Sequence, residues 1–372
     1  MKEEILTLNL LRFFAALGIL FVHKFSSLID LGYIPEFLKF LSPLTEHGYL
    51  GVNLFFLISG FVITLSSEGR TFGEFISARF IRLFPVFWIC VSITTLFTLL
   101  MSSVHISLFQ YLANLTMMPH YYGEYAFIDG SYWTLEIELR FYLFIAFILF
   151  IKTFINVSLQ KIALLISLPL LCHTLFYNPY SSSFLNVYGG YILMPFGYEY
   201  AQYFIAGILF YGIYKENKAY YNYIAIALCY CAAIIQALDH SYATNSPTII
   251  VLHITLFFGL FLAISLKKIP NTSYAFLGTA YKKILVTLGA ITYPLYLLHS
   301  VILNILIENI KRHEVSNYIA CILLFIILAT LIYYVNKIDF YLHQLWKKSS
   351  VIKNIMARVR YPCNKDNKFT KL

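Results

Sequence analysis

The stretch LRFFAALGILFVHKF, residues 11–25, is apolar enough to lie in a lipid bilayer, yet it contains Arg12 near its start and His23 near its end. A charged side chain at the centre of a membrane helix costs about 2.5 to 3.5 kcal/mol, even on the scale that assigns the smallest penalty. An ionisable residue in such a place is therefore a candidate functional residue, provided that the surrounding chain is a membrane helix.

The composition of the whole chain indicates a membrane protein. Of its 372 residues, 60% are hydrophobic and 12% are charged, and the mean hydropathy is +0.73; an ordinary soluble domain has about 25% charged residues. Apolar stretches long enough to cross a hydrocarbon layer of about 30 Å recur along the sequence. We expect an all-α polytopic bundle of about ten spans, at residues 5–25, 49–66, 84–102, 132–151, 161–177, 200–214, 222–238, 248–265, 284–306 and 318–336. The first is too long for a signal peptide and no cleavage site follows it.

The distribution of Lys and Arg gives this bundle an orientation. If the N-terminus is cytoplasmic, three of the outer loops, at 103–130, 178–199 and 239–247, contain no Lys or Arg, whereas the inner loops are rich in both. This asymmetry follows the positive-inside rule. We therefore expect a membrane domain at 1–340 and a basic cytoplasmic tail at 341–372. The formal net charge of +9 then indicates membrane lipid or phosphate as partners, and no nucleic acid.

The six cysteines predict neither a disulfide framework nor a metal site. Most of them lie in or at the edges of apolar spans. The pair Cys229-x-Cys231 lacks a second pair or a nearby histidine that would complete a zinc site. We expect no metal.

Arg12 and His23 lie on one face of their helix. Eleven residues at about 100° each return to within about 20° of the starting direction, and they separate the two side chains by about 16 Å along the axis. Arg12 then lies in the inner half of the membrane and His23 near the outer surface. In the alternative interpretation, Arg12 extends to the inner boundary and His23, followed by Lys24, only marks the outer one.

The segment SYWTLEIELRFY, residues 131–142, opens another span with three charged residues. Glu136 and Arg140 stand at i,i+4, so they can form an ion pair on the helix surface. Glu138 points roughly 200° away from Glu136 and has no partner within its segment. An acid of this kind normally faces the bundle interior or water, although it can also lie near the interface.

A further histidine follows in ITYPLYLLHS, residues 291–300. The expected topology places His299 in the outer half of the membrane. We therefore expect His23, Glu138 and His299 at similar depth, from three helices. The alternative for His299 is a structural, hydrogen-bonded histidine.

On the inner side, the segment FISARFIRLFP, residues 75–85, contains Arg79 and Arg82 at i,i+3. If the segment is helical, both side chains lie on one face. Guanidinium groups bind phosphate through paired hydrogen bonds, so the pair suits a phosphate group. Positive-inside topology is the competing explanation.

These motifs resemble the acyltransferase family 3, integral-membrane O-acyltransferases that modify bacterial surface glycans and related acceptors. Each motif is weak alone, but their order along the chain is specific. The resemblance is carried by LRFFAALGILFVH at 11–23, GVNLFFLISGF at 51–61, ARFIRLFP at 78–85, YWTLEIELRFY at 132–142 and ITYPLYLLH at 291–299.

The resemblance implies a role for each matching residue. His23 matches the proposed catalytic histidine of the family, and Arg12 matches its intramembrane arginine. Arg79 and Arg82 match the cytoplasmic motif for the acyl donor, which the family implies is acetyl-CoA, acting as a co-substrate. Many relatives also append an extracytoplasmic hydrolase-like domain. The expected spans of this chain are followed only by the short basic tail, so we expect the chain to complete the transfer alone or to pass the acyl group to a separate protein.

The glutamate motif departs from the family pattern at two positions. Glu138 matches the family glutamate that follows Trp133. Where relatives often have Ser after the Trp, this chain has Thr134, which keeps the hydroxyl. Where a second Glu often follows, it has Leu139, which removes the case for a carboxylate pair.

The implied reaction links the two ends of the opening stretch. Arg79 and Arg82 would hold the donor phosphates, and the pantetheine arm would extend past Arg12. His23 would act as general base for a sugar hydroxyl, with Glu138 orienting its imidazole and stabilising the charged form. A mechanism in which His23 itself becomes acylated stays open.

Binding of the acceptor would fall to residues at the outer mouth. We expect His299, Tyr132 and Trp133 to contribute to a sugar-binding surface. The alternative for the aromatic residues is the belt of Tyr and Trp common at membrane interfaces. The cluster contains Tyr121, Tyr122, Tyr125, Tyr132 and Trp133.

The function expected from these residues is O-acylation, most simply O-acetylation, of a surface or lipid-linked glycan such as lipopolysaccharide O-antigen, exopolysaccharide or capsule. The expected location is the bacterial inner membrane. The rival class is a transporter or flippase of a lipid-linked glycan, against which the sequence shows no paired halves with matching interrupted spans. A non-catalytic subunit of a glycan assembly complex is a third possibility.

Overall fold

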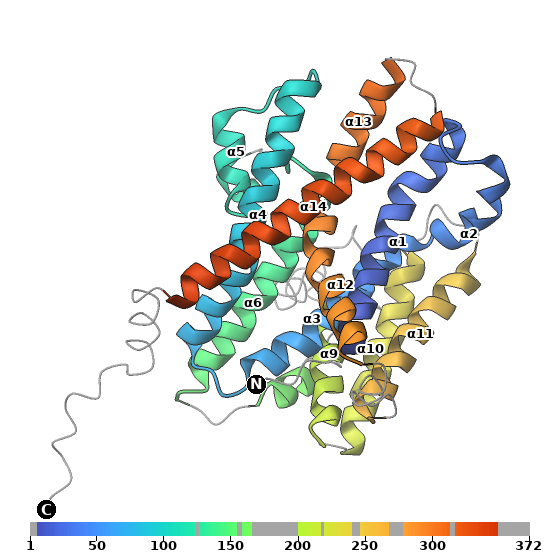
Figure 1. Cartoon of the computed structure of the whole chain (residues 1–372). Coiled ribbons are helices and arrows are strands. Elements are labelled where there is room, and N and C mark those ends of the chain that lie inside the picture. The colour runs from blue at the N-terminus through green and yellow to red at the C-terminus, as the bar shows by residue number, and fades with distance from the viewer. Residues whose placement is uncertain are drawn as a thin grey trace, which may run out of the picture.

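Every regular element that the computed structural model describes is a helix (Figure 1). The described residues are 6–123, 126–154, 158–165, 200–216, 219–239, 246–267, 278–312 and 317–348. The expectation of an all-α polytopic membrane protein is therefore confirmed. The long helices are α1 (Leu6–Asp30), α3 (Gly51–Ser67), α4 (Phe72–Met101), α6 (Trp133–Ile151), α9 (Ala201–Tyr214), α10 (Tyr220–Asp239), α11 (Pro247–Ser265), α12 (Gly278–Leu298), α13 (Val301–Arg312) and α14 (Asn317–Lys348).

Short helices connect some of these elements. Two α-helical segments, α2 (Ser42–Thr45) and α5 (Leu108–Asn114), lie in the connections after α1 and α4. Short segments of 3₁₀ helix complete them, at Glu36–Leu41, Gly48–Leu50, Pro119–Tyr122 and Gly130–Tyr132.

Fewer helices than expected meet the length and hydropathy of a membrane span. In the described part of the chain six helices do so, and the bent pair of α12 and α13 makes a seventh. Two expected spans are helices of another kind, since α6 contains three charged residues and α9 has only 14 residues. The span expected at 161–177 is helical at 161–165, and its remainder lies outside the described residues.

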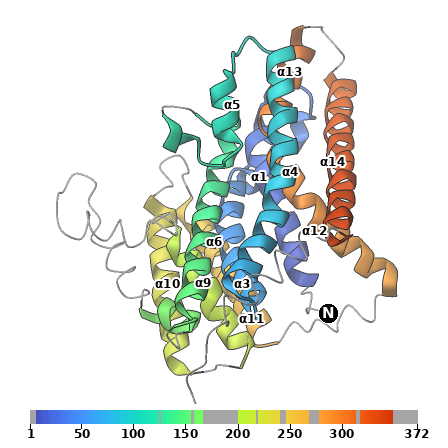
Figure 2. The same cartoon turned by 90° about the vertical axis from the view of Figure 1, so that its left-hand side faces the viewer.

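The short helix α9 lies inside the bundle rather than against lipid. All 14 of its residues are buried, and it packs along α3, with α10 and α11 on its other sides (Figures 1 and 2). Gly60 of α3 and Gly207 of α9 meet at the crossing. A Cβ atom added to Gly207 would lie 2.4 Å from the Leu57 carbonyl oxygen, so only glycine allows this approach.

Helix α4 begins well before the span that its hydropathy predicts. Thr71 and Glu74 form a reciprocal capping box, with the Glu74 carboxylate accepting from the Thr71 N–H at 3.1 Å. The helix therefore starts at Phe72, and Arg79 and Arg82 lie in its interior rather than in a loop. It packs against α6, α12, α13 and α14 (Figure 2).

The path of the chain near its C-terminal end also differs from the simplest expectation. Helices α12 and α13 are bent by 61° at a break beside His299. Helix α14 continues through residue 340, the expected domain boundary, to Lys348. The expected tail beyond Lys348 lies outside the described residues.

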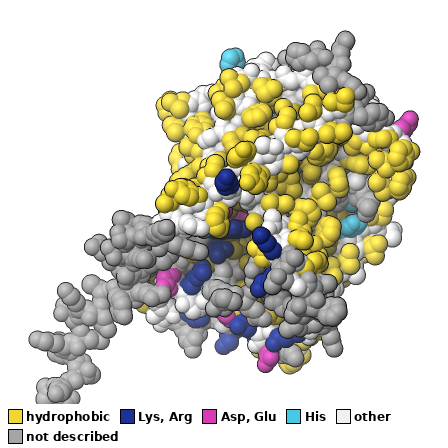
Figure 3. All heavy atoms as spheres, viewed as in Figure 1, with side chains coloured by type: hydrophobic (Ala, Val, Ile, Leu, Met, Phe, Trp, Pro, Cys, Tyr) yellow, Lys and Arg dark blue, Asp and Glu magenta, His cyan; other side chains and the backbone are white. Residues whose placement is uncertain are grey.

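The surface has the character expected for contact with lipid. Large apolar side chains are exposed on many helices, including Phe14, Leu99, Phe147, Leu256 and Ile326. Figure 3 shows hydrophobic atoms over the upper part of one face, with Lys and Arg below them around a hollow.

Candidate active site

A cavity of about 1000 Å³ lies among six helices, at the end of the bundle that carries the basic residues. Its walls come from α1, α3, α4, α6, α12 and α14. Arg82 is exposed, so the cavity reaches the surface there. Four arginines line the cavity against a single glutamate. The charged lining residues are Arg12, Arg70, Arg79, Arg82 and Glu138.

The arginines leave donor groups available to a ligand. The Arg79 guanidinium stands over the rings of Phe75 and Tyr142, 5.8 Å from each centroid. The Arg79 Nε and one terminal nitrogen of Arg70 are buried without a hydrogen-bond partner. Burial, with the nearby charge of Arg79, lowers the pKa of Arg70. An anion between these side chains would satisfy the donors and reduce their mutual repulsion.

Sequence reasoning predicted the placement of Arg79 and Arg82 on one face, and both line the same cavity. Arg70, in the connection before α4, was not predicted. It follows the Gly69 turn and looks like an ordinary positive-inside residue in the sequence. Only the folded connection brings it to the cavity.

Glu138 lies in the cavity together with Arg12. Its carboxylate accepts from the Tyr142 hydroxyl at 2.5 Å and from the Ser59 hydroxyl at 3.2 Å. The charges of Glu138 and Arg12 interact favourably. The prediction that Glu138 has no partner within its own segment is wrong, because Tyr142 lies one turn along the same helix. Ser59 on α3 is a further hydrogen-bond partner.

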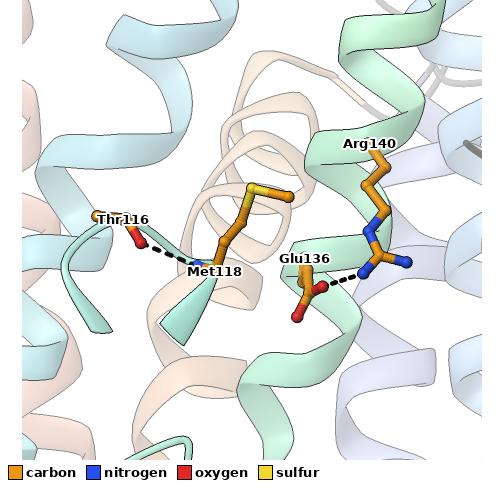
Figure 4. A network of polar contacts seen from close by, with 4 residues as sticks. All are labelled: Thr116, Met118, Glu136 and Arg140. Carbon is orange, nitrogen blue, oxygen red and sulfur yellow. Dashed lines mark hydrogen bonds and ion pairs between the residues drawn. The ribbon is translucent and has the colours of Figure 1, made fainter. Parts of the chain in front are cut away.

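The neighbouring acid, Glu136, has a structural role. It forms the expected ion pair with Arg140 (Figure 4). The expectation that this is an exposed surface pair is wrong, because Glu136 is only 6% exposed.

His23 lies at the other end of the bundle from Arg79 and Arg82, where it meets His299. The two imidazole centroids are 5.4 Å apart. His23 is exposed, whereas His299 is 1% exposed. His299 donates from Nδ1 to the Tyr296 carbonyl at 2.7 Å, and its Nε2 has no hydrogen-bond partner. The two histidines, which were expected only at similar depth, lie in contact with each other.

The third expected member of this cluster is not Glu138 but Asp129. Asp129 is fully buried in the connection before α6, and its charge acts on His23, Lys24 and His299. The charge of Glu138 acts on Arg12, and its hydrogen bonds go to Tyr142 and Ser59. In the described structure Asp129, rather than the expected Glu138, is therefore the acid whose charge acts on His23.

Hydrogen bonds fix the Asp129 carboxylate. One oxygen accepts from the Ser131 N–H at 2.8 Å and from its hydroxyl at 2.7 Å. The other accepts from the Val301 N–H at 3.0 Å, at the start of α13. The only signal in the sequence was an Asp two residues before a Ser, which is typical of a turn and does not point to a histidine on α1.

A thin layer of side chains separates the cavity from the histidine pair. Tyr296 lines the cavity, and its ring centroid lies 5.6 Å from that of His299. Its hydroxyl lies 2.7 Å from the Thr134 hydroxyl and donates to the Ser131 carbonyl at 3.0 Å. The hydroxyl that Thr134 keeps in place of the family serine is thus part of this layer.

Two of the residues expected to bind the acceptor, Tyr132 and Trp133, do not line the cavity. The Tyr132 ring is fully buried and its hydroxyl donates to the Leu297 carbonyl at 3.3 Å, so Tyr132 is a core residue and presents no face to a sugar. Trp133 packs against Phe56 and Tyr200, with centroids 6.5 and 5.4 Å away. His299 does adjoin His23, as described above. Within the described ranges, no group of three or more His, Cys, Asp or Glu side chains is placed to hold a metal ion.

Comparison with known proteins identifies a family for this chain. A family model described as an acyltransferase domain, of the acyltransferase 3 type, matches residues 5–334, nearly the whole chain. No curated protein and no solved structure gives a significant match. The matched region contains all of the motifs quoted above and both the cavity arginines and the histidine pair. The chain therefore belongs to the acyltransferase 3 family and is a membrane acyltransferase.

Proposed function

We propose that this acyltransferase moves an acyl group, most simply acetyl, from cytoplasmic acyl-CoA to a hydroxyl of a surface glycan or its lipid-linked precursor. Bacterial O-antigen, exopolysaccharide and capsule are acceptors of this kind, and the enzyme would act in the bacterial inner membrane. The observation that supports the proposal is the arginine-lined cavity, which begins at the basic face and ends at Tyr296, whose ring lies beside the buried His299 and so next to the His23–His299 pair.

The charge of the cavity suits the donor. CoA carries several phosphate charges at one end and a thioester at the end of a long, mostly neutral arm. Arg70, Arg79 and Arg82 would bind the phosphates, since two of them have buried donors without partners. The arm would extend past Arg12 and Glu138 toward Tyr296, so the thioester would lie close to the histidine pair.

The transfer itself needs a base near the outer surface. His23 would accept the proton of the sugar hydroxyl while its oxygen attacks the thioester carbonyl carbon. When the carbon–sulfur bond breaks, the thiolate of CoA would take the proton from the imidazolium, which restores neutral His23. The acyl group is then an ester on the sugar.

Asp129 is the group that favours this role for His23. Its buried negative charge acts on His23, so it would stabilise the imidazolium that forms during the transfer. His299, whose ring lies beside that of His23, would help to hold the His23 imidazole in place. The variant mechanism, in which His23 first receives the acyl group and then passes it to the sugar, uses the same residues and stays open.

The proposal is tested with purified protein in proteoliposomes, with radiolabelled acetyl-CoA as donor and the isolated glycan as acceptor. The double variant Arg79→Ala, Arg82→Ala should raise the donor KM with less change in kcat, as expected for lost ground-state binding. His23→Ala should abolish transfer at normal protein level. A matched control for positive charge on the basic face is Lys282→Ala with Lys283→Ala, because both lysines are exposed and neither lines the cavity.

The readouts separate the parts of the proposal. An unchanged donor KM in the arginine variant would show that Arg79 and Arg82 do not bind the donor, which leaves positive-inside topology as their explanation. Near-normal transfer by His23→Ala would remove His23 from the mechanism. The control for this variant is His105→Ala, because His105 is exposed in a loop. Surface glycan from cells with and without the gene, compared by NMR, should differ by an O-acetyl signal. Loss of that signal with export intact excludes the flippase.

A further inference from the structure

One wall of the cavity comes from the C-terminal part of α14, beyond the expected end of the membrane domain. His343 and Trp346 line the cavity there, on the same side as Arg82. They stand at i,i+3, so both lie on one face of the helix. Their ring centroids are 6.4 Å apart. The mechanism described above uses neither residue.

The His343 ring is held in one orientation. Its Nδ1 lies 3.0 Å from the Asp339 carbonyl oxygen and 3.1 Å from the Asp339 carboxylate. Because both of these are acceptors, Nδ1 carries a proton, and Nε2 is the ring nitrogen available to a ligand; it donates to a phosphate oxygen when the ring is an imidazolium. Trp346, one turn later, is half-buried beside it.

The chemistry of this wall differs from that of the rest of the cavity. Arginine side chains bind phosphate, whereas an indole face binds a flat aromatic ring by stacking. A tryptophan next to a phosphate-binding group is therefore suited to a nucleotide, which joins a base to phosphates at short range. The pantetheine arm of the donor has no such ring.

We propose that Trp346 and His343 form a subsite for the purine nucleotide end of CoA, with Trp346 stacking on the base and His343 close to a phosphate. This inference rests on the proposed function, because it assumes a CoA thioester as donor. It adds a selectivity: the enzyme distinguishes CoA thioesters from thioesters of 4′-phosphopantetheine alone, the group that carrier proteins present.

The competing explanation is that Trp346 anchors α14 at the membrane interface, as tryptophans often do. Loss of an anchor would affect insertion and stability, so activity would fall equally with every donor. A nucleotide subsite would affect only donors that contain the nucleotide. The two explanations therefore differ in a ratio that can be measured.

The experiment compares two donors, acetyl-CoA and S-acetyl-4′-phosphopantetheine, on full-length protein in proteoliposomes. Trp346→Ala should raise the KM for acetyl-CoA by about fivefold to 150-fold, the range of one base–aromatic stacking contact, and leave the KM for the short donor unchanged. Trp346→Phe should recover part of the loss. The control is Trp88→Ala, since Trp88 is exposed on α4 and does not line the cavity.

A direct binding measurement keeps this test separate from the proposed function. Adenosine 3′,5′-bisphosphate should quench the fluorescence of the wild-type protein, and the quenching should be lost in Trp346→Phe but kept in Trp88→Phe. If quenching occurs and neither donor supports transfer, the proposed function fails and the subsite stands. An unchanged KM for acetyl-CoA in Trp346→Ala, an equal loss with both donors, or quenching that survives in Trp346→Phe would overturn the subsite.

Discussion

Asp129 links three parts of the chain at the scale of a single side chain. Its two oxygens hold the turn at Ser131 and the first N–H of α13, while its charge acts on His23. A negative charge at a helix N-terminus is favourable, which contributes to its place beside Val301. The carboxylate is thus fixed before any substrate binds, which is what a group that stabilises a transient positive charge requires.

We expect Asp129→Asn to lower kcat by about 100-fold, within the range for a positioned acid–base group, because the amide keeps the size but loses the charge. The donor KM should stay unchanged, since Asp129 does not line the cavity. Steady-state kinetics with acetyl-CoA measures both. Asp30→Asn is the control, because Asp30 is exposed at the end of α1. A raised donor KM with normal kcat would contradict the role.

Substitution of the two glutamates of α6 should have different effects, on activity for Glu138 and on stability for Glu136. Glu138→Gln should lower activity by about tenfold to 100-fold, the value of one hydrogen bond to a charged group, with little change in thermal stability. Glu136→Gln removes a buried partner of Arg140 and should cost more than the roughly 0.5 kcal/mol of an exposed pair. Thermal unfolding in detergent and glycan O-acetyl content, at matched protein level, measure the two effects. If Glu136→Gln proves the inactive but stable variant, the assignment is wrong.

At the scale of elements, the crossing of α3 and α9 fixes the position of α3 in the wall of the cavity. The same helix α3 contributes Phe55 and Ser59 to the cavity and, one residue later, Gly60 to the crossing. A shift of α3 along α9 would therefore move the cavity wall relative to Glu138, whose carboxylate accepts from Ser59.

Gly207→Ala should destabilise the protein by about 1 to 3 kcal/mol, the usual cost of overpacking, because its Cβ would collide with backbone atoms that cannot rotate away. Gly259→Ala, in α11, is the matched control, since an added Cβ there has no atom within 4 Å. The melting temperature of the purified protein should fall for the first and not for the second. Equal melting temperatures would show that α3 and α9 are not so closely packed.

At the scale of the whole molecule, the two functional regions lie at opposite ends of the bundle. The arginines line the cavity at its basic end, whereas the exposed His23 lies outside the cavity, beyond Tyr296 and His299. In the proposed function, the arginines would bind donor phosphates on one side of the membrane and His23 would act as base near the other.

This arrangement predicts that the donor is used from one side only. Sealed inside-out membrane vesicles given radiolabelled acetyl-CoA should label the acceptor, because the basic face is then outward. Sealed right-side-out vesicles should not, until a detergent permeabilises them. Equal labelling by both sealed preparations would contradict the orientation.

The sequence by itself determined the class of fold and the local geometry of the site. Long apolar stretches predict helices because a bilayer leaves backbone groups no other partners. Helix periodicity then places Arg79 with Arg82 on one face and pairs Glu136 with Arg140, as the structure has them. The order of the motifs indicated the family.

The tertiary structure alone placed the charge of Asp129 where it acts on His23. Periodicity places residues around one helix, but it says nothing about the translation and rotation of that helix against its neighbours. Those are set by packing, such as the close approach of Gly60 to Gly207, and by connections such as the one that carries Asp129. Glu138 therefore meets Arg12, and Asp129, which no local pattern marks, acts on His23, because contacts between helices depend on side chains that are distant in the sequence.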